Sequence, residues 1–391
     1  MINQKHILMV NLPFSGHTNP TLELAKAFIA HGHHVTYVHS PEWQGEVEDT
    51  GAVFIPYDNY PDKQTNLQKE VNSWGAAYQT IQRIGRNYDC LVYEMLFFPG
   101  KSLADQLGIP SFRLFSTFTL NEKVLHDFGK TGGWYLTSIF RFSLLRKLIS
   151  QLLYKKFDLR YNDIVQEISE NTPELNFTYT IEAFQIYADD FNKKHYKYVG
   201  PSLGHRDDYA LDLSSLQAPI IYISLGTLVN TSKSFFQMCI TAFQEQPVSV
   251  IISIGNAIKK ESLGKIPNNI HIYTYVPQLE VLHQADLFIT HGGMNSVNEA
   301  IFYGVPMLVI PVGNDQPSVA QQVETLHLGK YLKRKGLNSI AIKEAVIAIL
   351  KDATYKERLQ VFQKKAQKAG GNEEVARLIL NTFSCTNPFG Y

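Results

Sequence analysis

Strand-like and helix-like segments alternate along this chain in two successive rounds. Short apolar runs bounded by turn residues have the character of buried parallel strands, and stretches with helical periodicity separate them. Such alternation predicts parallel sheets covered by helices, and two rounds predict two doubly wound α/β domains. The expected strands are residues 6–12, 34–39, 52–57, 89–94 and 111–115 in the first round, and residues 219–226, 248–254, 271–276, 287–290 and 307–310 in the second.

A polar stretch between the two rounds is the expected interdomain linker. It covers residues 204–218, so we expect an N-terminal domain over residues 1–203 and a C-terminal domain over residues 219–370. At 391 residues the chain is long enough for two domains that each bury a core of their own. A last helix is expected over residues 373–383, within the terminal segment 371–391.

The composition is that of a folded protein with balanced charge. Hydrophobic residues make up 45% of the chain and charged residues 18%, with 36 basic residues against 36 acidic ones. No basic tract is interleaved with aromatic residues, so nucleic acid is not an expected partner. The cysteines are odd in number and widely separated, which excludes a disulfide framework or a zinc site built from Cys90, Cys239 and Cys385.

Neither a signal peptide nor a membrane span is expected from the sequence. The apolar run near the N-terminus breaks at Asn11 and Pro13, which makes it too short for a signal peptide. No stretch approaches the ~20 apolar residues that a membrane-spanning helix needs. We therefore expect a cytoplasmic protein.

A strand, a glycine turn and a helix follow one another after residue 287. The turn is His291-Gly292-Gly293, and the helix is expected over residues 298–303. Glycines let the backbone approach a ligand closely, and the N–H groups of a first helical turn favour a diphosphate. Asn295 and Ser296 would add side-chain donors, although Ser296 is equally credible as a plain helix N-cap.

Glu299 is expected about one turn inside that helix. A carboxylate there can accept hydrogen bonds from two ribose hydroxyls. The alternative is a capping box, in which Glu299 pairs with Ser296 and serves the helix alone.

Residues 275–316 resemble the donor-binding box of the UDP-glycosyltransferases, and most closely that of the bacterial macrolide glycosyltransferases. The resemblance implies the GT-B fold, in which two Rossmann-like domains face each other across a cleft. It also implies that Gln278 lies beside the uracil, that the turn at His291 holds the phosphates, and that Glu299 holds the ribose. The positions assigned to the donor by resemblance are Gly226, Thr227, Tyr275, Val276, Gln278, His291, Gly293, Met294, Asn295, Ser296, Glu299, Asp315 and Gln316.

Two aromatic positions distinguish this box from that of the plant enzymes. Where the plant enzymes stack uracil on a tryptophan, this chain has Tyr275, which keeps a smaller aromatic face, unless it is only a half-buried strand residue. Met294 replaces a second tryptophan, so the match is to the bacterial branch. By resemblance, Asp315 and Gln316 contact the sugar hydroxyls. The turn at residues 226–227 lines the cleft near the phosphates, or is an ordinary strand-to-helix turn.

His17 is the candidate general base. It follows the first expected strand, within a Gly-His-x-Asn-Pro segment that precedes the helix expected over residues 21–31. The loop after a strand of an open α/β sheet lies at the carboxyl edge, where ligands bind. In the resembled family this histidine removes the proton from the acceptor hydroxyl as that oxygen attacks the anomeric carbon.

Glu94 is the candidate partner of His17. A carboxylate that fixes the tautomer of a histidine base and stabilises its cation makes the base more effective. Glu94 ends the expected strand 89–94, at a position where the resembled family has aspartate. The longer side chain could be absorbed by a small backbone shift or could weaken the pair. The alternative is a strand-end carboxylate that accepts a backbone hydrogen bond.

Residues 134–157 are apolar and aromatic, with interspersed lysine and arginine. An amphipathic helix of this kind can lie on a membrane surface or form one wall of a pocket for an apolar acceptor. The resembled family binds its acceptors in this region, so the sequence favours the pocket.

The resemblance implies an inverting transferase that moves a hexose, with glucose expected, from a UDP-sugar to a hydroxyl of a lipophilic small molecule such as a macrolide or flavonoid. The UDP-sugar is a co-substrate, and the family needs no catalytic metal or other cofactor. Two alternatives stay open, a nucleotide-sugar epimerase of the same fold and a non-catalytic binder of hydrophobic compounds.

Overall fold

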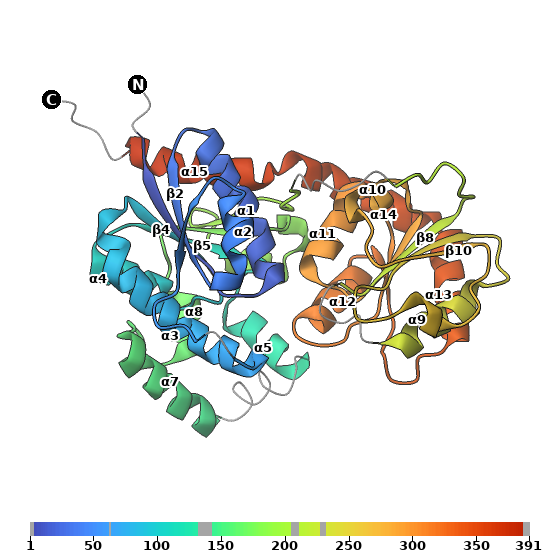
Figure 1. Ribbon diagram of the computed structural model, residues 1–391, viewed down its shortest axis with the longest axis horizontal. Coiled ribbons are helices and arrows are strands. Elements are labelled where there is room, and N and C mark those ends of the chain that lie inside the picture. Colours follow the sequence, from blue (N-terminus) through green and yellow to red (C-terminus); the bar gives the residue numbers. More distant parts are fainter. Residues whose placement is uncertain (1–3, 62–63, 132–142, 205–210, 227–231, 386–391) are drawn as a thin grey trace. The chain divides into compact units, whose positions relative to one another are not determined.

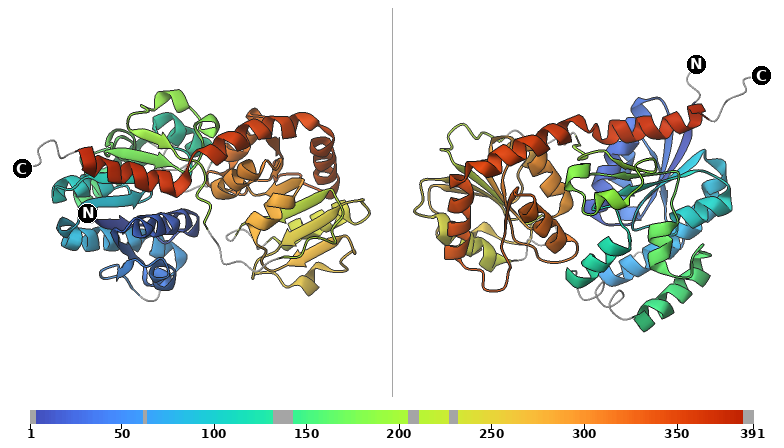
Figure 2. Two further views of the ribbon diagram at one scale, coloured as in Figure 1. Left: turned by 90° about the horizontal axis from the view of Figure 1, so that it is seen from above. Right: turned by 180° about the vertical axis from the view of Figure 1, so that it is seen from behind.

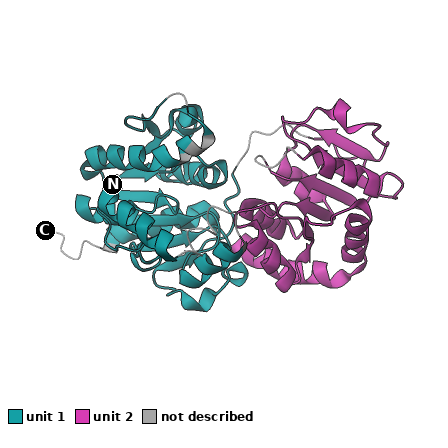
Figure 3. Ribbon diagram, turned by 90° about the horizontal axis from the view of Figure 1, so that it is seen from below, with its two compact units in different colours: residues 1–130, 137–204, 369–391 teal, residues 131–136, 205–368 magenta. Residues whose placement is uncertain are grey.

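The computed structural model describes residues 4–61, 64–131, 143–204, 211–226 and 232–385 (Figure 1). These residues form two compact units (Figure 3). Unit 1 contains the described residues up to 130, those of 143–204 and those from 369 onward, and unit 2 contains the described residues of 211–368. The boundary falls after Gly204, the described linker residues 211–218 belong to unit 2, and residues 205–210 are outside the described ranges.

Unit 1 is built on a seven-stranded parallel sheet. Its strand order is β3-β2-β1-β4-β5-β6-β7, so the direction of winding reverses between β1 and β4. The strands are β1 (His6–Val10), β2 (His34–His39), β3 (Val53–Pro56), β4 (Cys90–Glu94), β5 (Ser111–Phe115), β6 (Leu175–Thr178) and β7 (Tyr196–Tyr198).

Helices cover both faces of this sheet because the strands are apolar on both faces. Along β1, Ile7 and Met9 face one core cluster while Leu8 and Val10 face the other. Helices α1 and α15 pack on the first cluster, and α3 and α4 on the second. The helices are α1 (Ser15–Ala30), α2 (Gln44–Glu48), α3 (Asn66–Ile84), α4 (Gly100–Leu107), α5 (Glu122–Thr131), α7 (Ser143–Phe157), α8 (Ile164–Glu170) and α15 (Gly371–Cys385).

Unit 2 repeats the arrangement with six parallel strands in the order β10-β9-β8-β11-β12-β13. Its winding reverses between β8 and β11. The strands are β8 (Ile220–Ser224), β9 (Ser249–Ser253), β10 (Ile270–Tyr273), β11 (Leu287–Thr290), β12 (Met307–Val309) and β13 (Gly329–Tyr331). The helices are α9 (Lys233–Phe243), α10 (Gln278–Gln284), α11 (Met294–Tyr303), α12 (Gln316–Thr325), α13 (Ser339–Lys351) and α14 (Ala353–Lys368).

The prediction of two doubly wound α/β domains is confirmed, and every predicted strand is present within a few residues of its expected bounds. Two predicted helix starts are wrong. Helix α1 begins at Ser15, before Pro20, which it contains. A proline removes only its own N–H from the helical ladder, and the first turn closes through the N–H groups of His17 and Thr18 on the carbonyl of Phe14. Helix α11 likewise begins directly after Gly293.

The last helix, α15, belongs to unit 1 although it follows unit 2 in the sequence. It lies beside α1 (Figures 1 and 2), and its Val375 and Ile379 are fully buried in the unit 1 core. The N–H of Gly371 donates to the carbonyl of Val199 at 2.7 Å. Asn372 Nδ2 donates to Ser202 Oγ at 2.6 Å, so polar contacts fix the start of the helix and apolar contacts fix its body.

Replacing Ile379 by alanine is expected to destabilise the protein by ~2–5 kcal/mol, because the fully buried side chain would leave a cavity in the unit 1 core. Urea unfolding followed by circular dichroism measures the change. The exposed Asn381 on the same helix provides the matched control, since Asn381→Ala should shift stability by no more than ~0.5 kcal/mol. Equal effects of the two substitutions would contradict the packing of α15 described above.

Candidate functional site

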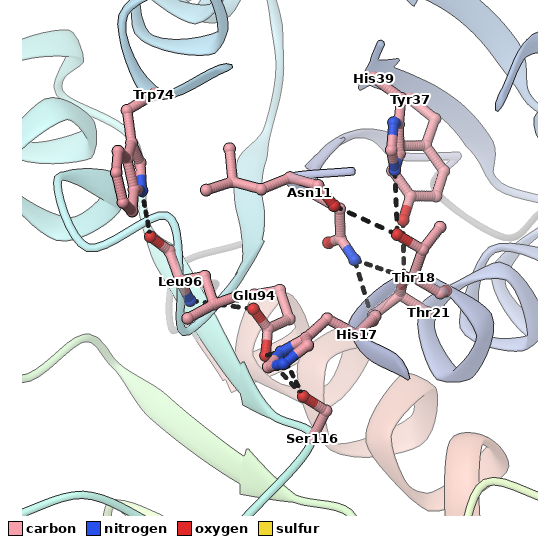
Figure 4. Close-up of polar contacts among 11 residues, drawn as sticks. Asn11, His17, Thr18, Thr21, Tyr37, His39, Trp74, Glu94, Leu96 and Ser116 are labelled. Carbon is pink, nitrogen blue, oxygen red and sulfur yellow. Dashed lines mark hydrogen bonds and ion pairs between the residues drawn. The ribbon is translucent and has the colours of Figure 1, made fainter. Parts of the chain in front are cut away.

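Three polar side chains meet at the carboxyl edge of the unit 1 sheet (Figure 4). His17 lies in the first turn of α1, directly after β1, and Glu94 is the last residue of β4. Ser116 follows β5. Strands β1, β4 and β5 are neighbours, so their carboxyl ends bring these residues together at the point where the winding reverses. His17 therefore occupies a helical turn rather than the expected loop.

The contacts within this cluster are short. His17 Nδ1 lies 2.6 Å from Glu94 Oε1, and Ser116 Oγ lies 2.6 Å from His17 Nδ1 and 2.8 Å from Glu94 Oε1. The glutamate is 1% exposed, whereas the histidine side chain is 25% exposed. Glu94 therefore contacts the imidazole of His17 although its side chain is one methylene longer than the aspartate of the resembled family.

The hydrogen bonds of Glu94 define the tautomer of His17. Glu94 Oε2 accepts from the backbone N–H of Leu96 at 2.9 Å, and Oε1 accepts from the Ser116 hydroxyl. A carboxylate that only accepts makes Nδ1 of His17 the protonated nitrogen, which leaves Nε2 to take a proton. The backbone hydrogen bond was the alternative role of Glu94, and the structure shows both contacts.

Ser116 is absent from the sequence-based site. A serine after a strand has no distinguishing local pattern, because serines are common there as turn residues. The available signal is positional: Ser116 directly follows the predicted strand 111–115, and strand ends of one parallel sheet share an edge.

A buried polar network supports the turn that carries His17 (Figure 4). Asn11 Nδ2 donates to the carbonyl of His17 and to Thr21 Oγ1, both at 3.0 Å. Thr21 Oγ1 lies 2.6 Å from the hydroxyl of Tyr37. His39 Nε2 lies 3.0 Å from Thr18 Oγ1, and burial lowers the pKa of His39 to about 3. The turn is therefore held in place by groups that stay uncharged at neutral pH.

In unit 2 the imidazole of His291 is enclosed by two glycines at the carboxyl edge of the sheet. Gly226 follows β8 and His291 follows β11, the two strands between which the winding reverses. A Cβ added to Gly226 would lie 2.7 Å from His291 Cε1, and one added to Gly293 would lie 2.6 Å from His291 Nε2. Gly226 also has φ +70°, a left-handed backbone conformation that favours glycine. A side chain at either position would therefore force the imidazole of His291 to move.

The side chain of Gln278 joins β8, α10 and α11. Its Oε1 accepts from the hydroxyl of Tyr222 at 3.1 Å, and its Nε2 donates to Ser296 Oγ at 3.2 Å and to Glu299 Oε2. Helix α11 has Gly293 as its N-cap, so Ser296 is inside the helix rather than at its cap. Glu299, which is 2% exposed, contacts Gln278, and these two predicted donor residues therefore form one cluster with Ser296.

The other predicted donor residues surround these two groups. Tyr275 is 49% exposed, whereas Val276 and Met294 are buried. Gln316 Oε1 accepts from the backbone N–H groups of Val312 and Gly313 at 2.8 and 3.2 Å, so the side chain braces the loop before α12. Asn295 lies in the first turn of α11, Asp315 is the N-cap of α12, and Thr227 lies outside the described residues.

Acidification is expected to destabilise both units through their buried histidines. Burial lowers the pKa of His291 to about 4 and that of His39 to about 3, from an ordinary value of 6.5. Below pH 6.5 the unfolded chain therefore binds protons that the folded chain does not. Above pH 6.5 the two histidines do not make the free energy of unfolding depend on pH. As the pH falls from 6.5 toward its folded pKa, each histidine lowers the free energy of unfolding by ~1.4 kcal/mol per pH unit.

Urea unfolding at about pH 7.5 and about pH 5 measures this loss. The midpoint should fall on acidification, and by less in a His39→Gln variant, which removes one of the two groups. A midpoint that falls equally in both proteins would show that His39 does not contribute to the acid sensitivity.

In the part of the chain that the structure describes, no three histidine, cysteine, aspartate or glutamate side chains are grouped where they could hold a metal ion. No helix among the described residues is long and apolar enough to span a bilayer.

Comparisons with known proteins identify the family to which this chain belongs. The family model described as "UDP-glucoronosyl and UDP-glucosyl transferase" matches residues 146–364. The NDP-glycosyltransferase YjiC of Bacillus subtilis is 34% identical over 388 residues, which cover 95% of each chain. The oleandomycin glycosyltransferase of Streptomyces antibioticus is 25% identical, over 96% of this chain and 90% of its own.

A solved structure has the same fold as this chain. The calicheamicin glycosyltransferase CalG4 superposes with a TM-score of 0.83 and 26% identity, over 99% of this chain and 100% of its own. The GT-B class implied by the resemblance is thereby confirmed. The chain belongs to the UDP-glycosyltransferase family, in its bacterial macrolide-type branch, and is a glycosyltransferase that uses a nucleoside-diphosphate sugar.

Proposed function

We propose that the protein is an inverting, cytoplasmic hexosyltransferase that uses UDP-glucose and glycosylates a hydroxyl of a lipophilic small molecule. The observation that carries the proposal is the contact of His17 Nδ1 with the buried carboxylate of Glu94 at 2.6 Å. The contact directs Nδ1 of the imidazole to the carboxylate and leaves Nε2 to accept a proton, on a side chain that is partly exposed.

In the proposed reaction the acceptor hydroxyl gives its proton to His17 Nε2 while its oxygen forms a bond to the anomeric carbon. The bond from that carbon to the UDP oxygen breaks, and UDP leaves with the electron pair. A single displacement from the face opposite UDP inverts the anomeric configuration. Glu94 stabilises the imidazolium that forms, because its Oε1 already accepts from Nδ1. The protonated His17 returns its proton to solvent after product release.

The donor roles in this proposal fall on unit 2. His291 Nδ1 is buried and has no hydrogen-bond partner among the described residues, which a diphosphate oxygen would supply. The N-terminus of α11 adds N–H groups that favour the same charge. Glu299 and Gln278 are assigned to the ribose and the uracil, and Tyr275 offers an exposed aromatic face for the base. Asp315 and Gln316 are assigned to the sugar hydroxyls. No metal takes part.

The acceptor class is proposed from the relatives. One relative is named for oleandomycin and one neighbour for calicheamicin, and these names support a natural product as the acceptor. We propose a lipophilic hydroxylated small molecule such as a macrolide or flavonoid. Residues 134–142, where the sequence favours part of an acceptor pocket, lie outside the described ranges.

A mass-spectrometric assay tests the proposal. The full chain is incubated with UDP-glucose, EDTA and a panel of macrolide and phenolic acceptors. We expect a product heavier by one hexosyl unit, with inverted anomeric configuration by NMR, and no product from a His17→Ala variant. Conversion of the UDP-sugar itself without any acceptor would favour the epimerase alternative. Binding of UDP and acceptor without product would favour the non-catalytic binder.

Substituting Ser116 by alanine is expected to lower turnover ~10-fold, because a hydrogen bond to a buried carboxylate is lost from the histidine pair. Ser116→Thr keeps the hydroxyl and should retain most of the activity. The turnover number measured across pH provides the readout, since a misplaced Glu94 should also shift the acid limb of the profile. Equal turnover of the alanine variant and the wild type would exclude a positioning role for Ser116.

A further inference from the structure

Helix α7 lies at the margin of unit 1, beyond α3 and α8 (Figures 1 and 2). Its sequence places a strip of exposed leucines on one side of the helix. The leucine strip consists of Leu144, Leu145, Leu148 and Leu152. Leu144, Leu148 and Leu152 are 72%, 56% and 70% exposed. Single exposed apolar residues are ordinary on a protein surface, but four on one helix form a contiguous patch, and such a patch marks an interaction surface.

The opposite face of α7 anchors the helix to unit 1. Phe157 is buried and makes edge contacts with the rings of Tyr78 and Phe98. Ser150 Oγ accepts from the backbone N–H of Ile164, and Arg146 forms an ion pair with Asp163 at 3.2 Å. The leucine strip is therefore exposed on a helix whose position is otherwise fixed, and the exposure is not a sign of an unpacked segment.

Lysines flank the leucine strip, and no acidic residue occurs in α7. Leu144, Leu148 and Leu152 are spaced four residues apart, which places them on one side of the helix. At ~100° per residue, Lys155 falls on the same side and Lys147 on one flank. Lys156 falls on the other flank, and its ammonium group lies 5.2 Å from the centroid of the Phe157 ring. All three lysines are exposed. Gln151 is also exposed on this side, and all charged residues of the helix are cations. An apolar strip with cations beside it has the character of a helix that lies in a membrane interface.

We propose that α7 docks unit 1 on an anionic lipid surface, with the leucine strip in the acyl boundary and the lysines on the headgroups. Charge complementarity favours lipid over a second copy of this chain, because a second α7 would bring the same cations against one another. A wall of a small-molecule pocket would enclose its leucines, whereas three members of the strip are more than half exposed. The proposal is independent of the proposed reaction.

Sedimentation with lipid vesicles tests the proposal on the full chain. Phosphatidylcholine vesicles containing roughly one-third phosphatidylglycerol should bind the protein, and pure phosphatidylcholine vesicles should bind it at least about tenfold more weakly. Raising NaCl from about 0.1 M to about 1 M should reduce binding to the anionic vesicles, because salt screens the lysines. A Lys147→Gln/Lys155→Gln variant should bind about fivefold more weakly for each lysine removed.

A double variant Leu148→Gln/Leu152→Gln should lose vesicle binding by about tenfold or more, because the apolar contribution is removed while the cations stay. Glutamine has nearly the helix propensity of leucine, so the helix is preserved, and circular dichroism checks the fold. The matched control is Ile340→Gln on α13, which removes an equally exposed apolar residue from unit 2 and should leave binding unchanged.

Three results would overturn the proposal. The first is a wild-type protein that sediments with neither vesicle. The second is a dimer in sedimentation velocity that the leucine double variant abolishes, which would identify a second copy as the occupant. The third is a leucine double variant that binds vesicles as the wild type does but has a raised KM for an apolar acceptor, which would place the strip in acceptor binding.

Discussion

A His17→Ala variant should turn over ~10²–10⁴-fold more slowly than the wild type, with unchanged affinity for UDP. Turnover falls because the variant lacks the imidazole, while Glu94 is only 1% exposed and still accepts from Ser116 and the backbone N–H of Leu96. UDP affinity is preserved because the proposed donor residues lie in unit 2 and His17 in unit 1. Product formation by mass spectrometry and UDP binding by calorimetry separate the two effects.

Glu94→Ala is the companion of that experiment. It should lower turnover in the same direction but by less, because the imidazole remains while its tautomer and its cation lose support. The double variant should be little worse than His17→Ala, because the two residues act as one unit. Wild-type turnover in either single variant would show that the histidine pair is not the catalytic base.

A Gly293→Ala variant should bind UDP at least about tenfold more weakly and be destabilised by ~1–3 kcal/mol. The new Cβ would lie 2.6 Å from Nε2 and 2.9 Å from Cε1 of His291, so the imidazole would have to move from its present position. Gly293 has φ −61°, so the backbone accepts alanine and the effect is purely steric. Calorimetric titration with UDP and urea unfolding measure the two losses.

Gly313→Ala is the matched control, since a Cβ there would meet nothing within 4 Å. It lies in the same unit, in the loop before α12, and should change neither UDP affinity nor stability by more than ~0.5 kcal/mol. If Gly293→Ala bound UDP as tightly as this control, the enclosed His291 would have no part in donor binding.

The buried strands are the part of the fold that the sequence predicts best. Strands β2, β5 and β11 match their expected bounds, because each is a short apolar run between turn residues. Strands β6, β7 and β13 escape prediction. The last two have only three residues each, with a lysine among them, and such segments are strands because a neighbouring strand pairs with them.

The sequence likewise predicts some residues of the candidate site and not others. His17 and Glu94 are predictable because each follows or ends an apolar strand within a familiar local pattern. Ser116 lies near these two residues because β4 pairs with β5. That pairing is a long-range contact, and no local sequence pattern around Ser116 predicts it. The start of α1 is unpredictable for a related reason, since Pro20 signals a helix boundary locally while the turn before it is closed by Phe14.

The position of α15 bears on how this protein is made and how it can be recombined. The ribosome finishes all of unit 2 before it synthesises residues 371–385, so the face of α1 that α15 covers has no covering helix until then. Synthesis of unit 1 therefore begins before that of unit 2 and ends after it. A chimera that exchanges unit 1 with that of a relative must carry the relative's last helix as well, because Val375 and Ile379 would otherwise meet a core shaped for other side chains.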